Sequence, residues 1–411
     1  MRGIALEGGG AKGAYQVGAL KALGELGIEY DVIAGSSIGA VNASILCSDG
    51  IETLESIWRD TQASDIIEGD KEILDQLLKM DFKGDNAKLR QFLIETVMQG
   101  GFDVSPYRKL LRRVVDEGKV RRSKMRYGLV TLSLTDLKPV ELFIEDIPEG
   151  KLLDYVFASS NFPAFKDERF DNKHMIDGGF FDNLPINMLL GAGCDSVIAI
   201  RLFGVGRIRK VKASDKTRVT YIEPSEPLGG TLEIDPERAR RNIQMGYYDT
   251  MRLMTKLEGR KYYLNRVPSE EEALSKFAEC SNIPILPLMA LFGSDQTAKR
   301  FLFETIIPVL AELLALDRNF TYSNVYVAAI EWLAEELGID RFETRSFEAL
   351  IEQVNKRMAS DPKYEKKTID ELDRKLILLI PNKGVKLLPE RVKKPLIQQI
   401  ILALYEAGLS K

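Results

Sequence analysis

Two glycine-rich turns near the start of the chain limit its fold more than any other feature. Each turn follows a short apolar run and precedes an apolar stretch with helical spacing. The first unit comprises residues 3–7, 8–13 and 14–26, and the second comprises residues 31–34, 35–39 and 40–47. A strand, a glycine turn and a helix, repeated in this order, are typical of a parallel sheet with helical crossovers. The sequence therefore predicts an α/β fold whose functional loops lie at the carboxyl ends of the strands.

A change of texture near residues 262–270 predicts a second region of the chain. The segments before it are helical or β-rich, and residues 195–203 read as a buried strand. After it, helical patterns follow one another without a strand pattern or a fixed repeat. The 411 residues are enough for two or three domains. We therefore predict an α/β domain at 1–265, with its motifs in a core at 3–205, and an all-α domain at 266–411.

The composition excludes several kinds of chemistry. His174 is the only histidine, so a histidine metal cluster is impossible and a Ser-His-Asp triad would have to use this residue. The three cysteines, Cys47, Cys194 and Cys280, are scattered, which argues against a disulfide framework and against a zinc site. No segment resembles an acidic calcium loop. We therefore expect that the chain uses neither a metal nor an organic cofactor.

Charge and hydropathy indicate which surfaces the chain is suited to. The formal net charge of −4 gives no general attraction to nucleic acid. The chain has no run of about eighteen apolar residues, and Glu7 interrupts any secretory signal. We therefore expect a cytoplasmic protein with at most peripheral contact to the inner membrane face. The basic runs at 121–124 and 207–212 are candidates for contact with anionic headgroups, and a solvated loop is the alternative for both.

The second glycine turn carries a candidate nucleophile. Residues 35–39, GSSIG, fit the pattern G-x-S-x-G with Ser37 at its centre. Gly35 and Gly39 permit a strained strand-to-helix turn that exposes the serine hydroxyl at the amino end of the following helix. The alternative is an ordinary Gly/Ser loop that caps a helix. The position between a predicted strand and a small-residue helix favours the nucleophile.

The first glycine turn is a candidate anion-binding loop. Residues 8–13 read GGGAKG and contain G-x-G-x-x-G, which raises the possibility of a dinucleotide site. Such a site requires an acidic residue at the end of the second strand, whereas Asp31 begins that strand. The other use is an oxyanion hole built from backbone N–H groups, opposite a nucleophile. Lys12 would either add positive charge to this site or lie in solvent.

A third motif supplies a candidate base for Ser37. Asp177-Gly178-Gly179 is on its own a common turn. Because Ser37 needs a base and the chain offers a single histidine, a serine–carboxylate dyad with Asp177 is the economical arrangement. His174 lies three residues before Asp177, and residues three apart on a strand point to opposite faces. We therefore expect His174 to point away from Ser37, and no step in activity from a histidine.

The order GGGAKG, GSSIG and DGG resembles the patatin-like phospholipase family. Residues 158–165 and the sequence Asn183-Leu184-Pro185 strengthen the likeness, which covers roughly residues 3–205 and continues more weakly, towards bacterial members, to about Tyr263. The resemblance implies a three-layer α/β sandwich with a mostly parallel sheet. It also implies that Ser37 is the nucleophile and Asp177 the base, with Gly9, Gly10 and Ala11 as amide donors in an oxyanion hole formed by 8–13.

The resemblance implies a serine acyl hydrolase acting on phospholipids or other acyl esters. The alternatives are an acyltransferase on the same fold and a lipid-binding signalling module with vestigial activity. The helical region would regulate the enzyme or form a homo-oligomer. Four aromatic residues are candidates for an acyl-chain channel, with helical core packing as the alternative: Trp58, Phe82, Phe92 and Phe102.

Overall fold

The computed structural model divides the chain into two compact units, Met1–Met254 and Thr255–Lys411. It describes residues 1–69, 100–166, 169–170, 172–212, 214–215, 217–360, 369–380 and 384–410. Phe82 and Phe92 lie outside these residues. Within the described part, no helix has both the length and the apolar character that crossing a membrane requires.

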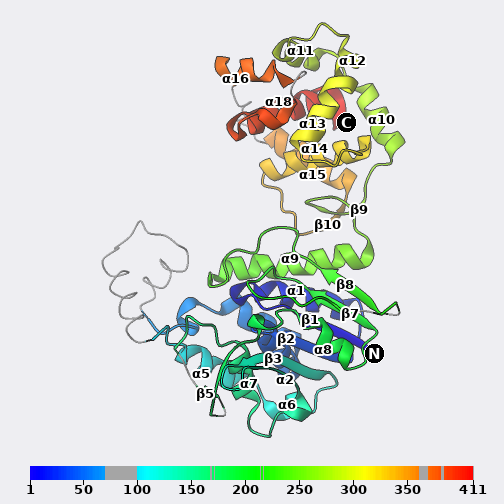
Figure 1. Cartoon of the computed structure of the whole chain (residues 1–411). Helices are drawn as coiled ribbons and strands as arrows, with labels where there is room; N and C mark the ends of the chain where they lie inside the picture. Colours follow the sequence, from blue (N-terminus) through cyan, green and yellow to red (C-terminus); the bar gives the residue numbers. More distant parts are fainter. Residues whose placement is uncertain are drawn as a thin grey trace. The chain divides into compact units, whose positions relative to one another are not determined.

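An eight-stranded sheet forms the centre of the first unit (Figure 1). Its strands are β1 (Arg2–Leu6), β2 (Val32–Ser36), β3 (Arg126–Ser133), β4 (Lys138–Phe143), β5 (Arg169–Phe170), β6 (Lys173–Asp177), β7 (Ser196–Ile200) and β8 (Arg218–Ile222). The order is β5-β6-β3-β2-β1-β7-β8, with β4 paired to β3. Strands β3, β2, β1, β7 and β8 are parallel, and β4, β5 and β6 are antiparallel to their neighbours. The predicted mostly parallel sheet is confirmed.

Helices cover both faces of this sheet. The helices of the first unit are α1 (Ala14–Glu25), α2 (Ile38–Asp60), α5 (Ser105–Val114), α6 (Glu117–Arg121), α7 (Leu152–Ser159), α8 (Ile186–Gly191) and α9 (Pro236–Thr255). On one face, α8 packs against small strand residues that include Ala5 and Ala34. On the other face, Gly39 of α2 lies against the backbone of Leu6. Helices α1 and α9 pack closely through Gly18. The sheet and the helices on its two faces form three layers.

The second unit is helical, with one small addition. Its helices are α10 (Glu270–Glu279), α11 (Leu286–Phe292), α12 (Ala298–Phe301), α13 (Ile307–Leu313), α14 (Tyr322–Glu336), α15 (Phe347–Ser360), α16 (Glu371–Ile377) and α18 (Glu390–Leu404). They enclose a continuous hydrophobic core. The structure adds two short parallel strands, β9 (Tyr263–Arg266) and β10 (Thr344–Ser346). Segments this short carry no readable two-residue alternation, which explains why the sequence predicts helices only.

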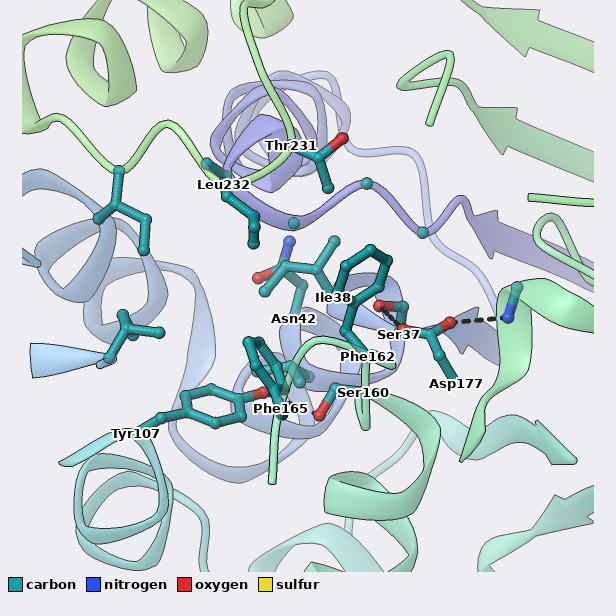
Figure 2. A pocket seen from close by; sticks show the side chains of 18 of the residues that line it. Ser37, Ile38, Asn42, Tyr107, Ser160, Phe162, Phe165, Asp177, Thr231 and Leu232 are labelled. Atoms are coloured by element: carbon teal, nitrogen blue, oxygen red, sulfur yellow. Dashed lines mark hydrogen bonds between the residues drawn. The ribbon is translucent and has the colours of Figure 1, made fainter. Parts of the chain in front are cut away.

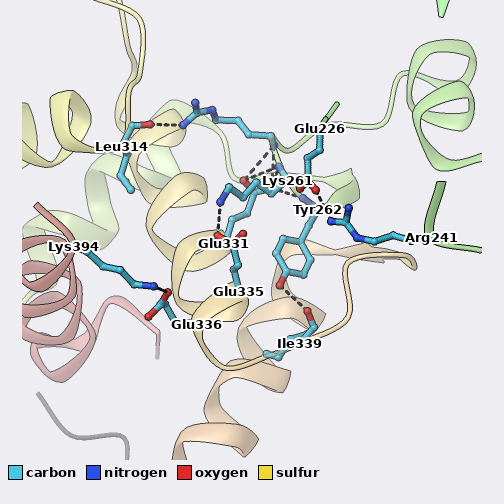
Figure 3. Close-up of polar contacts among 11 residues, drawn as sticks. Glu226, Arg241, Lys261, Tyr262, Leu314, Glu331, Glu335, Glu336, Ile339 and Lys394 are labelled. Atoms are coloured by element: carbon cyan, nitrogen blue, oxygen red, sulfur yellow. Dashed lines mark hydrogen bonds and ion pairs between the residues drawn. The ribbon is translucent and has the colours of Figure 1, made fainter. Parts of the chain in front are cut away.

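A buried carboxylate holds the start of the second unit together (Figure 3). Glu331 of α14 is 1% exposed. Its two oxygens accept hydrogen bonds from the backbone N–H groups of Arg260, Lys261 and Tyr262, at 2.9–3.3 Å. The Tyr262 hydroxyl donates to the Ile339 carbonyl at 2.8 Å. These bonds fix the segment that leads into β9 against α14.

Candidate active site

Strands β2 and β6 bring Ser37 and Asp177 together because they meet end to end along β3. Ser36, the last residue of β2, is in register with Val130 of β3. Asp177, the last residue of β6, is in register with Thr131, the next residue of β3. Strand β4 occupies the other edge of β3 over the same stretch, so β2 and β6 share one edge. The two strands run toward each other and place Ser37 and Asp177 at their junction.

Ser37 has the geometry of a strained nucleophile. Its φ is +54° and its ψ is −126°, a conformation that few residues other than glycine adopt. The flanking glycines leave room for this turn, because a Cβ on Gly35 would lie 2.2 Å from the backbone of Gly39. The Ser37 hydroxyl donates to Asp177 Oδ2 at 2.5 Å (Figure 2). The Ser37 N–H donates to Ser159 Oγ at 3.0 Å, which fixes the turn against the end of α7.

Asp177 is a buried carboxylate with few partners. Its exposed fraction is 6%. Burial raises its pKa from 3.8 to about 6, although the hydrogen bonds from the Ser37 hydroxyl and the Gly179 N–H oppose that shift. The Gly179 N–H donates to Asp177 Oδ1 at 2.8 Å, which leaves Oδ2 directed at Ser37. A carboxylate with a pKa near 6 is charged at neutral pH and basic enough to take the serine proton.

The glycine loop lies opposite this pair, with fewer amides available than expected. Gly8, Gly9, Gly10 and Ala11 line the same cavity as Ser37. The Ala11 N–H already donates to the Thr231 carbonyl at 2.7 Å, and its role as a donor of the oxyanion hole stays a prediction. The loop 229–234, which the sequence did not connect to the site, supplies that carbonyl.

The other backbone N–H groups of the loop fall into two groups, those with a hydrogen-bond acceptor and those without one. The Gly8 N–H donates to the Asn183 carbonyl at 3.0 Å, and the Lys12 N–H donates to the Gly9 carbonyl at 3.3 Å. Gly13 belongs to a short 3-10 helix, Gly10–Gly13. Among the described residues, no acceptor is found for the N–H groups of Gly9 and Gly10. These two amides remain candidates for the predicted oxyanion hole.

The side chain of Lys12 has a hydrogen-bond partner in the segment after β7. Its ammonium donates to the Phe203 carbonyl at 3.0 Å. It therefore ties the glycine loop to the segment after β7. A carbonyl is neutral and leaves the ammonium charged, so both roles considered for Lys12 stay predictions.

Two residues that the sequence did not assign to the site hold the glycine loop in place. Glu7 is fully buried and accepts hydrogen bonds from Arg201 Nε, the Leu202 N–H and the Gly204 N–H, at 2.8–3.2 Å. Asn183 donates from its amide to the Gly8 carbonyl at 3.1 Å. Glu7 directly follows an apolar strand, and carboxylates are rarely buried without partners. Its position in the sequence therefore indicates a buried, hydrogen-bonded role.

His174 lies away from Ser37. Its ring Nε2 accepts a hydrogen bond from Arg169 Nε at 3.1 Å, and its backbone N–H donates to Thr135 Oγ1 at 2.9 Å. Asp177, three residues later on β6, bonds to Ser37 instead. The alternation of side chains along β6 separates the two residues as expected.

An apolar cavity of about 460 Å³ opens beside the Ser37–Asp177 pair. Its lining includes Val41, Ile45, Trp58, Leu111, Phe162 and Phe165. Trp58 thus belongs to the cavity, whereas Phe102 packs against Ala63 and Ile67 outside it. A buried polar pair interrupts the apolar wall, since the Tyr107 hydroxyl donates to Ser160 Oγ at 3.0 Å (Figure 2). This volume is within the range of cavities that bind small ligands.

Comparisons with known proteins agree with the motifs. The family model "Patatin-like phospholipase" matches residues 4–190. The chain is 28% identical over 201 residues to patatin-like phospholipase domain-containing protein 7 of Rattus norvegicus, covering 48% of this chain and 13% of that protein. It is 26% identical over 204 residues to lysophospholipase nte1 of Aspergillus oryzae, covering 48% and 11%. The matches thus span a small part of these relatives.

A similar solved structure is that of VipD from Legionella pneumophila. It shares 15% sequence identity with this chain, and the alignment covers 99% of this chain and 90% of VipD. The TM-score is 0.40.

Proposed function

We propose that this chain is a serine acyl hydrolase that cleaves fatty acyl esters of lipids, because the patatin-like phospholipase family model matches residues 4–190. One observation supports the proposal most. The Ser37 hydroxyl donates to a buried carboxylate of raised pKa, opposite two amides without acceptors in the described structure and beside an apolar cavity. The proposal thus assigns nucleophile, base, oxyanion site and acyl site to one pocket.

The proposed reaction proceeds in two steps. Asp177 accepts the hydroxyl proton of Ser37 while Ser37 Oγ attacks the ester carbonyl. The N–H groups of Gly9 and Gly10 stabilise the resulting oxyanion. Asp177 then returns the proton to the leaving alcohol, which completes the acyl-enzyme. Water gives its proton to Asp177 and attacks the acyl-enzyme. The fatty acid leaves, and the proton on Asp177 returns to Ser37.

The cavity favours a lipid over a small polar ester. Its lining beside Ser37 is apolar, and each methylene of an acyl chain buried there contributes about 0.8 kcal/mol to binding. A phospholipid or a lysophospholipid is therefore the proposed substrate. The proposal includes a cytoplasmic location with peripheral contact at the inner membrane face. It also assigns the helical second unit a regulatory or oligomerising role.

A test combines product analysis with active-site labelling. Purified protein is incubated with mixed phospholipids, and released fatty acids and lysolipids are identified by mass spectrometry. A fluorophosphonate probe is expected to label the wild type and not Ser37→Ala. Adding an alcohol or lysolipid acceptor separates hydrolysis from transfer. A folded wild type that neither reacts with the probe nor releases fatty acid would overturn the proposal and favour a lipid-binding module.

A further inference from the structure

Exposed apolar side chains gather at the rim of the cavity. Val205 is 84% exposed and Phe180 is 49% exposed, and both line the cavity beside Ser37. Phe203 and Ile208, in the same loop as Val205, are 52% and 40% exposed. A group of exposed apolar residues beside a binding site is typical of a surface that contacts another apolar phase.

The same loop is basic. Residues 203–212, here called the rim loop, contain four basic residues and no acidic residue. Arg207, Lys210 and Lys212 are exposed, whereas Arg209 is half-buried and lies 3.6 Å from Glu141. Ile208, Lys210 and Lys212 are exposed and alternate with the half-buried Arg209 and Val211, so these three residues form the outward face of the segment.

The rim loop is held firmly against the active site. The Arg207 N–H donates to the Gly179 carbonyl at 2.8 Å, and the Asn183 N–H donates to the Arg207 carbonyl at 2.7 Å. Further along, the Asn187 side chain bonds to the Lys210 carbonyl and to the Lys212 N–H, at 3.0 and 2.8 Å. The outward face therefore keeps a fixed position relative to the turn that follows Asp177.

The first residue of the rim loop is strained. Phe203 has a φ of +48°, which is unfavourable for a bulky side chain. Lys12 and Glu7 maintain this conformation, through the Phe203 carbonyl and the Gly204 N–H respectively. Strain of this kind persists only where the surrounding structure imposes it, and it concentrates at functional sites.

We propose that the rim loop docks the cavity entrance onto an anionic lipid bilayer. Phe203, Val205 and Ile208 enter the interface, and Lys210 and Lys212 contact acidic headgroups. The inference rests on the proposed function, because an enzyme that hydrolyses membrane lipids must receive its substrate from the bilayer. Docking at the rim places the entrance, through Val205 and Phe180, directly against the lipid.

The test measures partition onto vesicles of phosphatidylcholine alone or mixed with phosphatidylserine, in the Ser37→Ala background so that lipid is not consumed. Lys210→Gln/Lys212→Gln should weaken binding to the anionic vesicles about 25-fold, with no effect on neutral vesicles, because each basic residue near an anionic surface contributes roughly a fivefold factor. Phe203→Asn/Ile208→Asn should weaken binding to both kinds about tenfold. Asparagine tolerates the left-handed conformation at position 203.

Matched controls lie in the second unit. Ile283 is 76% exposed, and Ile283→Ser should not change partition. Lys299→Gln/Lys375→Gln removes the same charge from exposed positions and should also have no effect. Equal losses in these controls, or full binding by both rim-loop variants, would overturn the inference.

A second measurement needs no loss-of-function variant. The three native cysteines are buried, so Ile208→Cys can be labelled selectively with an environment-sensitive dye. Its emission should shift to the blue on anionic vesicles, and that of labelled Ile283→Cys should not. The absence of a shift at position 208 contradicts docking. Turnover of a water-soluble ester by the active chain is measured in parallel: turnover without vesicle binding refutes docking alone, and binding without turnover refutes the hydrolase.

Discussion

Each unit of the chain contains a buried carboxylate, and the two are used differently. Glu331 in the second unit receives three consecutive backbone N–H groups, and its oxygens are fully engaged (Figure 3). Asp177 in the first unit receives one backbone N–H and one side-chain hydroxyl, and burial raises its pKa to about 6. A buried acid with fixed amide donors stabilises a fold, whereas a buried acid paired with a hydroxyl can exchange a proton with it. The predictions below test this contrast.

Loss of either member of the Ser37–Asp177 pair should have the largest effect. Ser37→Ala and Asp177→Asn should each lower kcat on a p-nitrophenyl acyl ester by at least about a thousandfold, because both remove the activated nucleophile. Residues that act as one unit lose activity non-additively, so the double variant should be no worse than either single variant. Glu331→Gln is the matched control and should keep kcat. Substantial turnover by folded Ser37→Ala would contradict the mechanism.

Truncation of the other carboxylate should affect stability and not chemistry. Glu331→Ala removes the acceptor of the buried Tyr262 N–H and of the part-buried Arg260 and Lys261 N–H groups, and hydrogen bonds to a charged group each contribute roughly 1.5–3 kcal/mol. We expect the second unit to lose about 3–5 kcal/mol in the free energy of unfolding, as measured by denaturant titration. Glu331→Gln retains one acceptor oxygen and should lose less. Equal stability of Glu331→Ala and wild type would contradict the claim that Glu331 stabilises the second unit.

Asp177→Asn should have the opposite effect on stability. The folded pKa of Asp177, about 6, lies above its ordinary value of 3.8, so burial of the charged form costs stability. That cost is absent below pH 3.8, grows as the pH rises and is complete above about pH 6. Asparagine carries no such cost, so Asp177→Asn should exceed wild type by at most about 3 kcal/mol at pH 7.5, and the difference should vanish near pH 4.

A matched variant with the opposite sign sharpens this measurement. The Ser105 and Lys166 groups beside Asp103 lower the pKa of that carboxyl to about 2. Asp103→Asn should therefore lose stability at neutral pH and not gain it. A destabilised Asp177→Asn at pH 7.5 would show that its hydrogen bonds outweigh the burial cost.

The contrast also explains which features the sequence could predict. The turns at Gly35–Gly39 and Gly8–Gly13 follow from local glycine requirements. The strand–turn–helix order and the position of Ser37 can therefore be predicted from the sequence. The pairing with Asp177 depends on β2 and β6 meeting along β3, which the sequence indicates only through its motifs. The contact between the Ala11 N–H and Thr231 joins residues far apart in sequence and has no local signal. Glu331 lies mid-helix, where glutamate usually faces solvent.

The pH dependence of activity should follow Asp177. The base must be charged to accept the Ser37 proton, so kcat/KM should fall about tenfold per unit of pH below about pH 6 and level off above it. Asp182 is a second buried carboxyl whose pKa burial raises to about 6, and it lies five residues further on. Asp182→Asn distinguishes the two, because the acid limb should persist in this variant if Asp177 is the base.

The smallest expected effect is that of His174→Gln, and it decides how the acid limb is assigned. The sequence led us to expect no histidine step, yet a step from Asp177 falls close to the ordinary histidine range near 6.5. The pH profile alone therefore cannot separate a dyad from a triad. His174 bonds to Arg169 on β5, whereas the Ser37 hydroxyl bonds to Asp177, so His174→Gln should retain both kcat and the position of the limb. A thousandfold loss of kcat in folded His174→Gln, or disappearance of the limb, would make His174 the general base, since a missing base costs about 10²–10⁴-fold.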